Sequence, residues 1–182
     1  PDVSFAILSR TSTEIKALLD DLQIDAGITY LDNEPLGRVT SIPLYRERYQ
    51  LVTSNLKELG DYEAITWREA ASLPLCLLTP DMQNRRIIDQ QLHMAGAKVS
   101  ATLESDSMIA LFTHVQTGNW ASIMPEKMVE SFGMRDRVKA IPIIEPDASQ
   151  TVGLIAAKRE PATPVVSALL KEAAHISELQ TV

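Results

Sequence analysis

Residues 23–54 read QIDAGITYLDNEPLGRVTSIPLYRERYQLVTS, and they carry the strongest structural signal in the chain. Residues 24–31 are largely apolar, too short for a lone helix and bounded by turn residues, which is typical of a strand covered on both faces in a parallel α/β sheet. After a loop rich in Asn, Asp, Pro and Gly, an extended run at 39–43 is interrupted by charges at 45–48 and resumes at 49–53. A strand that stops and restarts predicts a chain that passes from one lobe into another.

The residues before this stretch predict the start of the same sheet. Residues 3–8 form a short β-type run, and apolar residues in 13–22 recur at the spacing of one helical face. Thr11 and Glu14 fit a capping box at the start of that helix. The order strand, helix, strand predicts a βαβ unit with parallel strands and a right-handed crossover.

The remainder of the chain predicts a second lobe and a return to the first. Expected helices lie at 65–71, at 80–93, between the cap Ser105-Asp106-Ser107 and Gly118, and at 126–132; expected strands lie at 75–78, 98–103, 120–125 and 138–144. A polar break at 145–149 is the predicted return crossing. A strand at 151–157 and a helix opening at Thr163-Pro164 follow. We therefore expect one lobe from residues 1–46 and 149–182 and another from 47–148, with a small-ligand cleft between them.

Composition excludes several classes of protein. The 182 residues carry a formal net charge of −7 with scattered basic residues, which argues against a nucleic-acid surface on this part of the protein. No apolar run approaches the roughly 20 residues of a membrane span. The single cysteine, Cys76, lies in an apolar run, where core packing is the expected role rather than nucleophilic catalysis. A lone cysteine fits a reducing compartment, so we expect a cytoplasmic protein.

Two groups of residues resemble a known family. The sequence Ile-Asp-Ala-Gly-Ile, a polar loop, and then Pro-Leu-Tyr-Arg-Glu-Arg-Tyr-Gln-Leu-Val-Thr resembles the effector-binding domain of LysR-type transcriptional regulators. Residues 103–111 and 116–125 are similar to a second pattern of that family, from which they depart at Asn119 and Trp120. The resemblance spans nearly the whole chain, although each motif alone is a degenerate hydrophobic pattern.

The resemblance implies the periplasmic-binding-protein type II fold, an α/β architecture of two lobes joined by two crossover strands with a ligand cleft between them. It also implies a winged helix-turn-helix, a linker helix, and a first strand and helix before Pro1, none of which this chain contains. The sheet of the first lobe should therefore lack one strand.

Catalytic and metal-binding motifs are missing from the sequence. It contains no G-x-S-x-G, H-E-x-x-H, Walker loop or G-x-G-x-x-G. The three histidines, His93, His114 and His175, lie in separate predicted helices and share no metal-ligand spacing. We therefore expect no enzyme activity, no cofactor and no metal site.

The candidate site consists of helix N-termini at the carboxyl ends of strands, where free N–H groups and the helix dipole favour anions. Ser9, Arg10 and Thr11 form one such segment, residues 79–85 a second and Ser105-Asp106-Ser107 a third. Simple helix capping explains Thr11 equally well, and it is the favoured explanation for Asp81 and for the Ser105 segment. With the strand end at Thr29 and the lining segments implied by the resemblance, the candidate effector-binding residues are Ser9, Arg10, Thr11, Thr29, Tyr30, Met82, Gln83 and Ser105.

The leading hypothesis is the ligand-sensing domain of a LysR-type regulator. A small anionic metabolite would bind between the lobes and so control DNA binding by a homodimer or homotetramer of the full-length protein. DNA would be contacted only through the N-terminal domain that this chain lacks, so these 182 residues alone should not bind it. The alternatives are a solute-binding protein of a transporter and an enzyme on the same fold.

Overall fold

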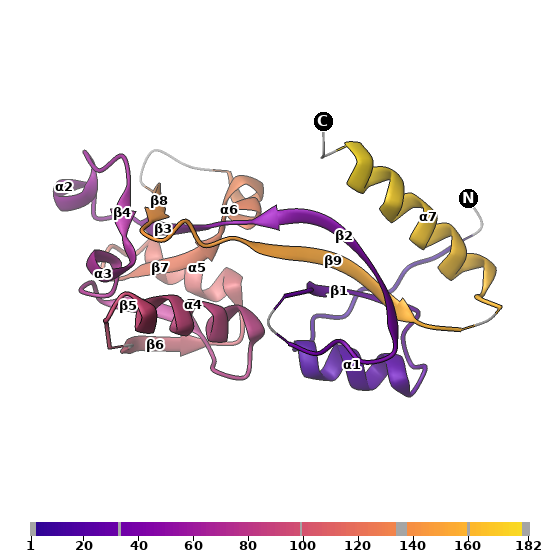
Figure 1. The fold of residues 1–182 in the computed structure, drawn as a ribbon. Helices are drawn as coiled ribbons and strands as arrows, with labels where there is room; N and C mark the ends of the chain where they lie inside the picture. The colour runs from indigo at the N-terminus through magenta and orange to yellow at the C-terminus, as the bar shows by residue number, and fades with distance from the viewer. Residues whose placement is uncertain (1–2, 33, 99, 134–137, 160, 180–182) are drawn as a thin grey trace. The chain divides into compact units, whose positions relative to one another are not determined.

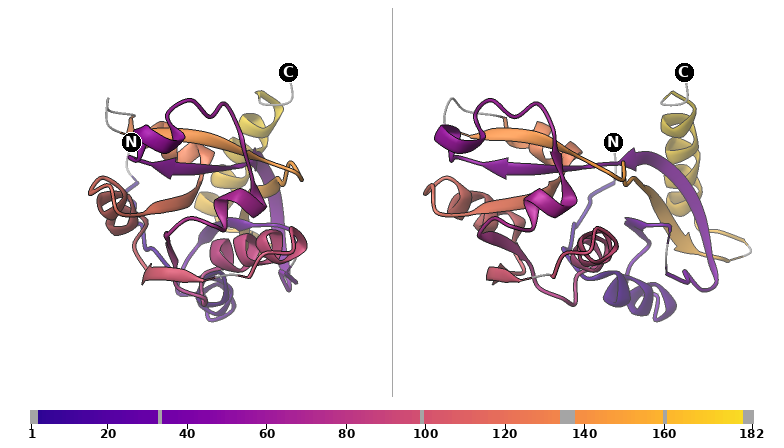
Figure 2. Two further views of the ribbon diagram at one scale, coloured as in Figure 1. Left: turned by 90° about the vertical axis from the view of Figure 1, so that its left-hand side faces the viewer. Right: turned by 60° about the vertical axis from the view of Figure 1, so that its left-hand side comes forward.

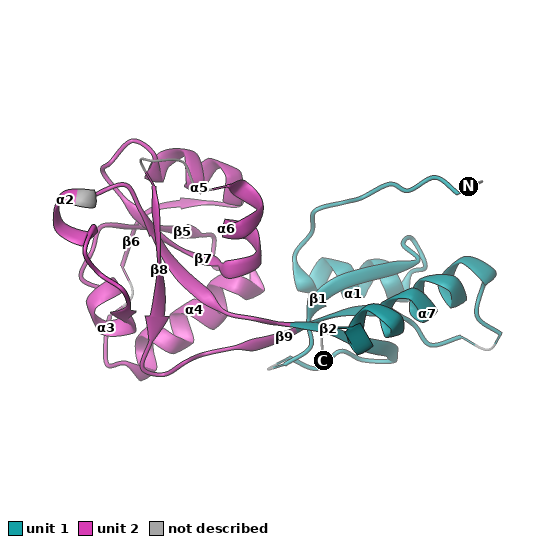
Figure 3. Ribbon diagram, turned by 90° about the horizontal axis from the view of Figure 1, so that it is seen from above, with its two compact units in different colours: residues 1–45, 152–182 teal, residues 46–151 magenta. Residues whose placement is uncertain are grey.

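The computed structural model describes residues 3–32, 34–98, 100–133, 138–159 and 161–179. It divides into two compact units, residues 1–45 with 152–182 (unit 1) and residues 46–151 (unit 2) (Figure 3). The strand β2 (Val39–Glu47) carries the chain from unit 1 into unit 2, and β9 (Gln150–Ala157) carries it back. Each unit is described by itself below.

Unit 1 contains a three-stranded sheet between two helices (Figures 1 and 2). The strand order is β1-β9-β2, with β1 at Ala26–Tyr30 antiparallel to β9. The helix α1 (Ser12–Asp20) covers one face of this sheet and α7 (Pro164–Leu179) the other. The capping box predicted for α1 is confirmed, because the Thr11 hydroxyl accepts from the Glu14 N–H while the Glu14 carboxylate accepts from the Thr11 N–H.

The strand predicted at residues 3–8 is wrong. Residues 3–10 form no strand or helix, and all eight are exposed, with 70% of Phe5 and 95% of Ile7 accessible to solvent. The β-type pattern is present, but a strand also needs a neighbour to pair with its N–H and C=O groups. No strand pairs with these residues in the described part of the chain, so the predicted parallel βαβ unit is not formed.

The strand predicted at 24–31 exists, but its surroundings differ from the prediction. β1 is five residues long, pairs antiparallel with β9 rather than parallel, and is not covered on both faces, since Ile28 is 60% exposed. Its apolar composition is that of a central strand, whereas its position in the sheet is at the edge.

Unit 2 is built on a six-stranded sheet of order β4-β8-β3-β7-β5-β6. Its strands are β3 (Tyr49–Thr53), β4 (Ile65–Thr66), β5 (Leu75–Leu78), β6 (Ala101–Ser105), β7 (Ala121–Pro125) and β8 (Lys139–Ile144). Its helices are α2 (Leu56–Leu59), α3 (Trp67–Ala70), α4 (Gln83–Met94), α5 (Met108–Val115) and α6 (Glu126–Phe132). β3 is antiparallel to β7 and β8, whereas β5 and β6 are parallel.

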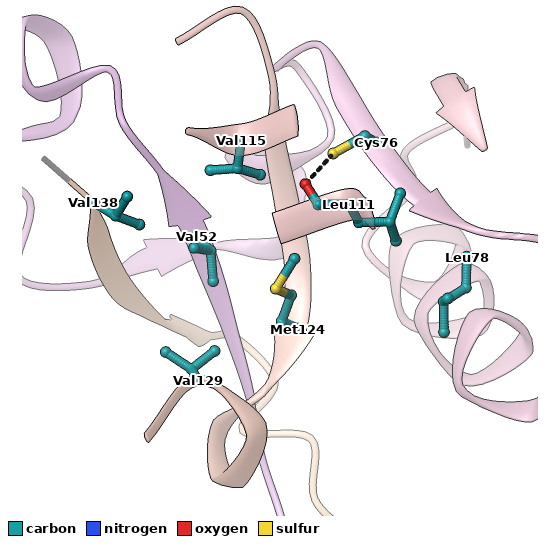
Figure 4. Close-up of a cluster of buried hydrophobic side chains, with 8 residues drawn as sticks. All are labelled: Val52, Cys76, Leu78, Leu111, Val115, Met124, Val129 and Val138. Atoms are coloured by element: carbon teal, nitrogen blue, oxygen red, sulfur yellow. Dashed lines mark hydrogen bonds between the residues drawn. The ribbon is translucent and has the colours of Figure 1, made fainter. Parts of the chain in front are cut away.

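One core cluster of unit 2 joins the central strands to α5 and α6. Its buried members are Val52, Cys76, Leu78, Leu111, Val115, Met124, Val129 and Val138 (Figure 4). All but Val138, which directly precedes β8, come from strands at the middle of the sheet or from α5 and α6, as the apolar spacing of the sequence predicts. This cluster fixes the position of α5 over β5 and β7.

The break predicted at residues 45–48 is shorter than expected. β2 continues through Glu47 and β3 begins at Tyr49, so only Arg48 lies outside a strand. The charged side chains instead bind the returning segment: the Arg46 guanidinium donates to the Thr151 hydroxyl at 2.9 Å, and Arg48 pairs with Asp147 at 3.0 Å. The charged residues of this stretch therefore link the outgoing segment to the returning segment, and they do not end the strand.

Candidate functional site

In unit 1 the predicted residues Ser9, Arg10 and Thr11 lead into α1. The Thr11 hydroxyl is engaged by the capping box with Glu14, so capping accounts for its presence. Arg10 is exposed, and its Nη1 donates to the Ser9 carbonyl at 2.7 Å. A guanidinium has five N–H donors, which leaves donors of Arg10 for a carboxylate or phosphate.

Thr29 and Tyr30 form the carboxyl end of β1, as predicted. Thr29 is 8% exposed and lies opposite Gly153 of β9, and Tyr30, which is half-buried, lies opposite Val152. Both side chains therefore belong to the packed part of unit 1.

In unit 2 the structure brings the other predicted segments to one edge of the sheet. β5 and β6 run parallel with Leu78 opposite Ser105, and the Thr79 N–H donates to the Ser105 carbonyl at 3.1 Å. Met82 and Gln83 follow from β5 into α4, and Gln83 is buried as the first helical residue. Met82, Gln83 and Ser105 thus lie on segments that leave neighbouring strand ends.

The N-termini of α4 and α5 are capped differently. The cap expected at Asp81 is wrong, because the N-cap of α4 is Met82, which makes no side-chain capping bond. At α5 the Ser107 hydroxyl accepts from the Ala110 N–H, and the Ser105 hydroxyl accepts from the Ser107 N–H. Ser105 is therefore part of a local turn, whereas the first turn of α4 is capped by no side chain of its N-cap residue.

Sequence reasoning missed the role of Arg85, which holds this edge together. Its guanidinium is 7% exposed and donates to the Leu78 carbonyl at 2.6 Å, to Glu104 at 2.7 Å and to Asp89 at 2.7 Å. Burial alone would lower the pKa of Arg85, but hydrogen bonds and attraction from Glu104 and Asp89 outweigh burial and raise that pKa. Arg85 therefore stays charged and ties α4 to the ends of β5 and β6.

A second feature missed in the sequence is the buried hydroxyl of Thr79. Its Oγ1 is inaccessible to solvent and has no hydrogen-bond partner among the described residues. Such a group costs free energy unless something binds it. It lies between the end of β5 and the first turn of α4, beside the backbone of Ser105.

Cys76 is a core residue of unit 2. It is fully buried, its Sγ lies 3.8 Å from the Leu111 carbonyl oxygen, and burial raises the pKa of its thiol (Figure 4). A protonated, inaccessible thiol is a poor nucleophile. The described residues contain no group of three His, Cys, Asp or Glu side chains placed to hold a metal ion.

Comparison with solved structures identifies the fold. The effector-binding domain of QuiR in complex with shikimate is 20% identical, with a TM-score of 0.79 over 93% of this chain and 79% of that one. The regulatory domain of Synechocystis PCC6803 CcmR in complex with 2-PG is 13% identical, with a TM-score of 0.79 over 92% of this chain and 80% of that one. The reduced regulatory domain of OxyR from Pseudomonas aeruginosa is 18% identical, with a TM-score of 0.74 over 92% of this chain and 78% of that one.

These similarities confirm the predicted periplasmic-binding-protein type II fold. We found no significant match among curated proteins. None of the helices in the described ranges is long and apolar enough to cross a membrane. The model of the LysR substrate binding domain matches residues 1–176, and the chain therefore belongs to that family.

Proposed function

We propose that this chain is the ligand-sensing domain of a LysR-type transcriptional regulator and binds a small anionic metabolite. The observation that carries the proposal is the family match over residues 1–176. In the full-length protein, acting in the cytoplasm as a homodimer or homotetramer, the bound metabolite would control DNA binding by a separate N-terminal domain. The family match favours this function over a transport receptor or an enzyme.

Two features of the chain support an anionic ligand. The first turn of α4 presents N–H groups and the positive end of the helix dipole beside the buried Thr79 hydroxyl. Arg10 adds an exposed guanidinium at the start of α1. The structural neighbour QuiR is in complex with shikimate, which carries a carboxylate. Shikimate is therefore the first compound to titrate, followed by other small carboxylates and phosphate esters.

The direct test is calorimetric titration of residues 1–182 with these compounds, together with thermal melting. A ligand at a hundred times its Kd stabilises the folded state by about 2.7 kcal/mol, which is readily measured. Binding without turnover, together with no sequence-specific DNA binding by residues 1–182, supports the proposal. Turnover of a bound compound would replace it with the enzyme alternative.

Arg10→Ala is expected to weaken effector binding. Loss of a charge-assisted hydrogen bond to a carboxylate costs about 1.5–3 kcal/mol, or roughly a ten- to 150-fold increase in Kd. Titration of the variant with the same anion measures this change. Arg38→Ala is the control, since it removes another exposed guanidinium from unit 1. Equal affinities of Arg10→Ala and the wild type would exclude Arg10 from the site.

Thr79→Val is expected to change stability and binding in opposite directions. Removal of a buried hydroxyl without a partner should leave the free protein as stable as the wild type or more stable by about 1 kcal/mol. Effector affinity should fall, because the hydroxyl that would bond the anion is gone. Thr102→Val, at an exposed position of β6, is the control. Destabilisation of the free protein by Thr79→Val would show that the hydroxyl has a structural partner.

A further inference from the structure

Arg85 lies where three elements of unit 2 meet. It belongs to the first turn of α4, and its Nη1 donates to the carbonyl of Leu78, the last residue of β5, at 2.6 Å and to the carboxylate of Glu104 in β6 at 2.7 Å. Its Nε donates to Asp89, one turn further along α4, at 2.7 Å. Because the side chain of Arg85 is 7% exposed, water cannot readily replace a partner that is lost.

The two carboxylates that contact Arg85 differ in position. Asp89 is on the same helix, at i, i+4 spacing, so its ion pair with Arg85 stays within α4. Glu104 is on β6, so its ion pair joins the helix to the strand. The exposed fractions of the two side chains are similar, 32% for Asp89 and 43% for Glu104. The two residues therefore differ mainly in what each of them connects to Arg85.

The contacts of Arg85 close a ring at this edge of the sheet. Glu104 is followed directly by Ser105, whose carbonyl accepts from the Thr79 N–H at 3.1 Å. Thr79 in turn follows Leu78, whose carbonyl accepts from Arg85. All candidate residues of unit 2 lie on the two segments that this ring joins: Met82, Gln83 and Ser105. Their positions relative to one another therefore depend on the ring.

We propose that Glu104, acting through Arg85, is a positioning residue for the effector. It does not touch the effector, but it holds the ends of β5 and β6 in the arrangement that binds it. The inference rests on the proposed function, because it concerns the same site. A segment that is already ordered costs less to bind than one that the ligand must order. Glu104 thus raises affinity by fixing the site before the effector arrives.

Charge alone predicts the opposite effect. Glu104 is acidic, and a negative charge close to an anion-binding site weakens the binding of anions. On this basis removal of either carboxylate should strengthen anion binding, and Asp89 and Glu104 should behave alike. A positioning role predicts instead that loss of Glu104 weakens binding, whereas loss of Asp89 does not. The sign of the change therefore separates the two roles.

Hydrogen–deuterium exchange on residues 1–182 tests the proposal without an effector. Glu104→Ala and Asp89→Ala form a matched pair, since each removes one carboxylate from Arg85 and the same charge from the protein. The amide of Thr79, which bonds to the Ser105 carbonyl, should exchange about tenfold faster in Glu104→Ala and at the wild-type rate in Asp89→Ala. Equal exchange rates in the two variants would overturn the proposal.

Titration with shikimate and with inorganic phosphate measures the effect on binding. In Glu104→Ala the Kd of the anion that binds should rise about tenfold, because the anion must then order the segment itself. Asp89→Ala should leave that Kd unchanged or lower it. Glu104→Gln keeps an acceptor oxygen for Arg85, so it should recover most of the affinity. An unchanged or lower Kd in Glu104→Ala would exclude the positioning role.

The two measurements keep this inference separate from the proposed function. If the wild type binds neither anion, the proposed function fails for these compounds, while exchange at Thr79 still decides whether Glu104 fixes the strand ends. Faster exchange with an unchanged Kd would leave the proposed function intact and contradict the inference. Weaker binding by Glu104→Ala without faster exchange would show that Glu104 contacts the anion directly, which contradicts the inference as well.

Discussion

Replacing Trp67 with alanine is expected to lower the free energy of unfolding of unit 2 by about 3–5 kcal/mol. Trp67 is fully buried, and its ring meets that of Tyr49 edge-on with 6.0 Å between centroids. Its Nε1 donates to the Pro146 carbonyl at 3.0 Å. Alanine would leave a large cavity and remove the donor of that bond. Since single domains are stable by only about 5–15 kcal/mol, this is a large part of the total.

Denaturant unfolding followed by fluorescence measures the effect. The only other tryptophan of the chain, Trp120, also lies in unit 2 and remains as the probe. Trp67→Phe is the matched control, because it keeps most of the apolar volume and removes the hydrogen bond to Pro146. It should cost about 1–2 kcal/mol. Equal losses for the two variants would show that the hydrogen bond, and not the buried volume, accounts for the effect.

The elements that could be predicted are those whose signal is local. The α1 helix was predicted by apolar spacing and by the pair Thr11 and Glu14, and its capping box is confirmed. β5 and β7 were predicted from short apolar runs bounded by turn residues, and both are present at full burial. In each case the residues that determine the structure lie within one turn or one strand.

The predictions that were wrong concern features that depend on residues distant in the sequence. Residues 3–8 have a strand pattern but no neighbour, and β1 has the composition of a central strand at the edge of a sheet. Spacing along the sequence does not state which strand is adjacent to which. Both errors follow from the same assumption, that a strand pattern is enough to form a paired strand.

In the candidate site, too, local features can be predicted from the sequence, whereas features that depend on distant residues cannot. The pair of Arg85 and Asp89 is visible in the sequence at i, i+4 spacing, but the bonds of Arg85 to Glu104 and to the Leu78 carbonyl depend on the pairing of β5 with β6. The buried hydroxyl of Thr79 likewise has no sequence signal. Effector binding stays a prediction, until a ligand is titrated, for all eight candidate residues: Ser9, Arg10, Thr11, Thr29, Tyr30, Met82, Gln83 and Ser105.

Gly153→Ala is the second change with a large expected effect, and it acts on unit 1. A Cβ at this position of β9 would lie 2.5 Å from the Ile42 carbonyl oxygen of β2 and 2.5 Å from Cδ1 of Leu31. A side chain can rotate away, but a backbone carbonyl in the same sheet cannot move without disturbing the strands. We therefore expect a loss of about 3 kcal/mol, the upper end of what overpacking usually costs, and a larger loss for Gly153→Val.

Gly27→Ala separates this backbone clash from crowding in general. Its Cβ would also meet an atom at 2.5 Å, but that atom is the Cγ2 methyl of Ile15, a half-buried side chain of α1 and not a backbone atom of the sheet. Gly27→Ala should therefore cost less than Gly153→Ala. Circular dichroism follows both units, whereas tryptophan fluorescence follows unit 2 alone, since both tryptophans lie there. Gly153→Ala should lower the unfolding midpoint measured by circular dichroism more than the midpoint measured by fluorescence. Equal losses of stability in Gly153→Ala and Gly27→Ala would show that the Ile42 carbonyl is not the rigid contact that makes Gly153 necessary.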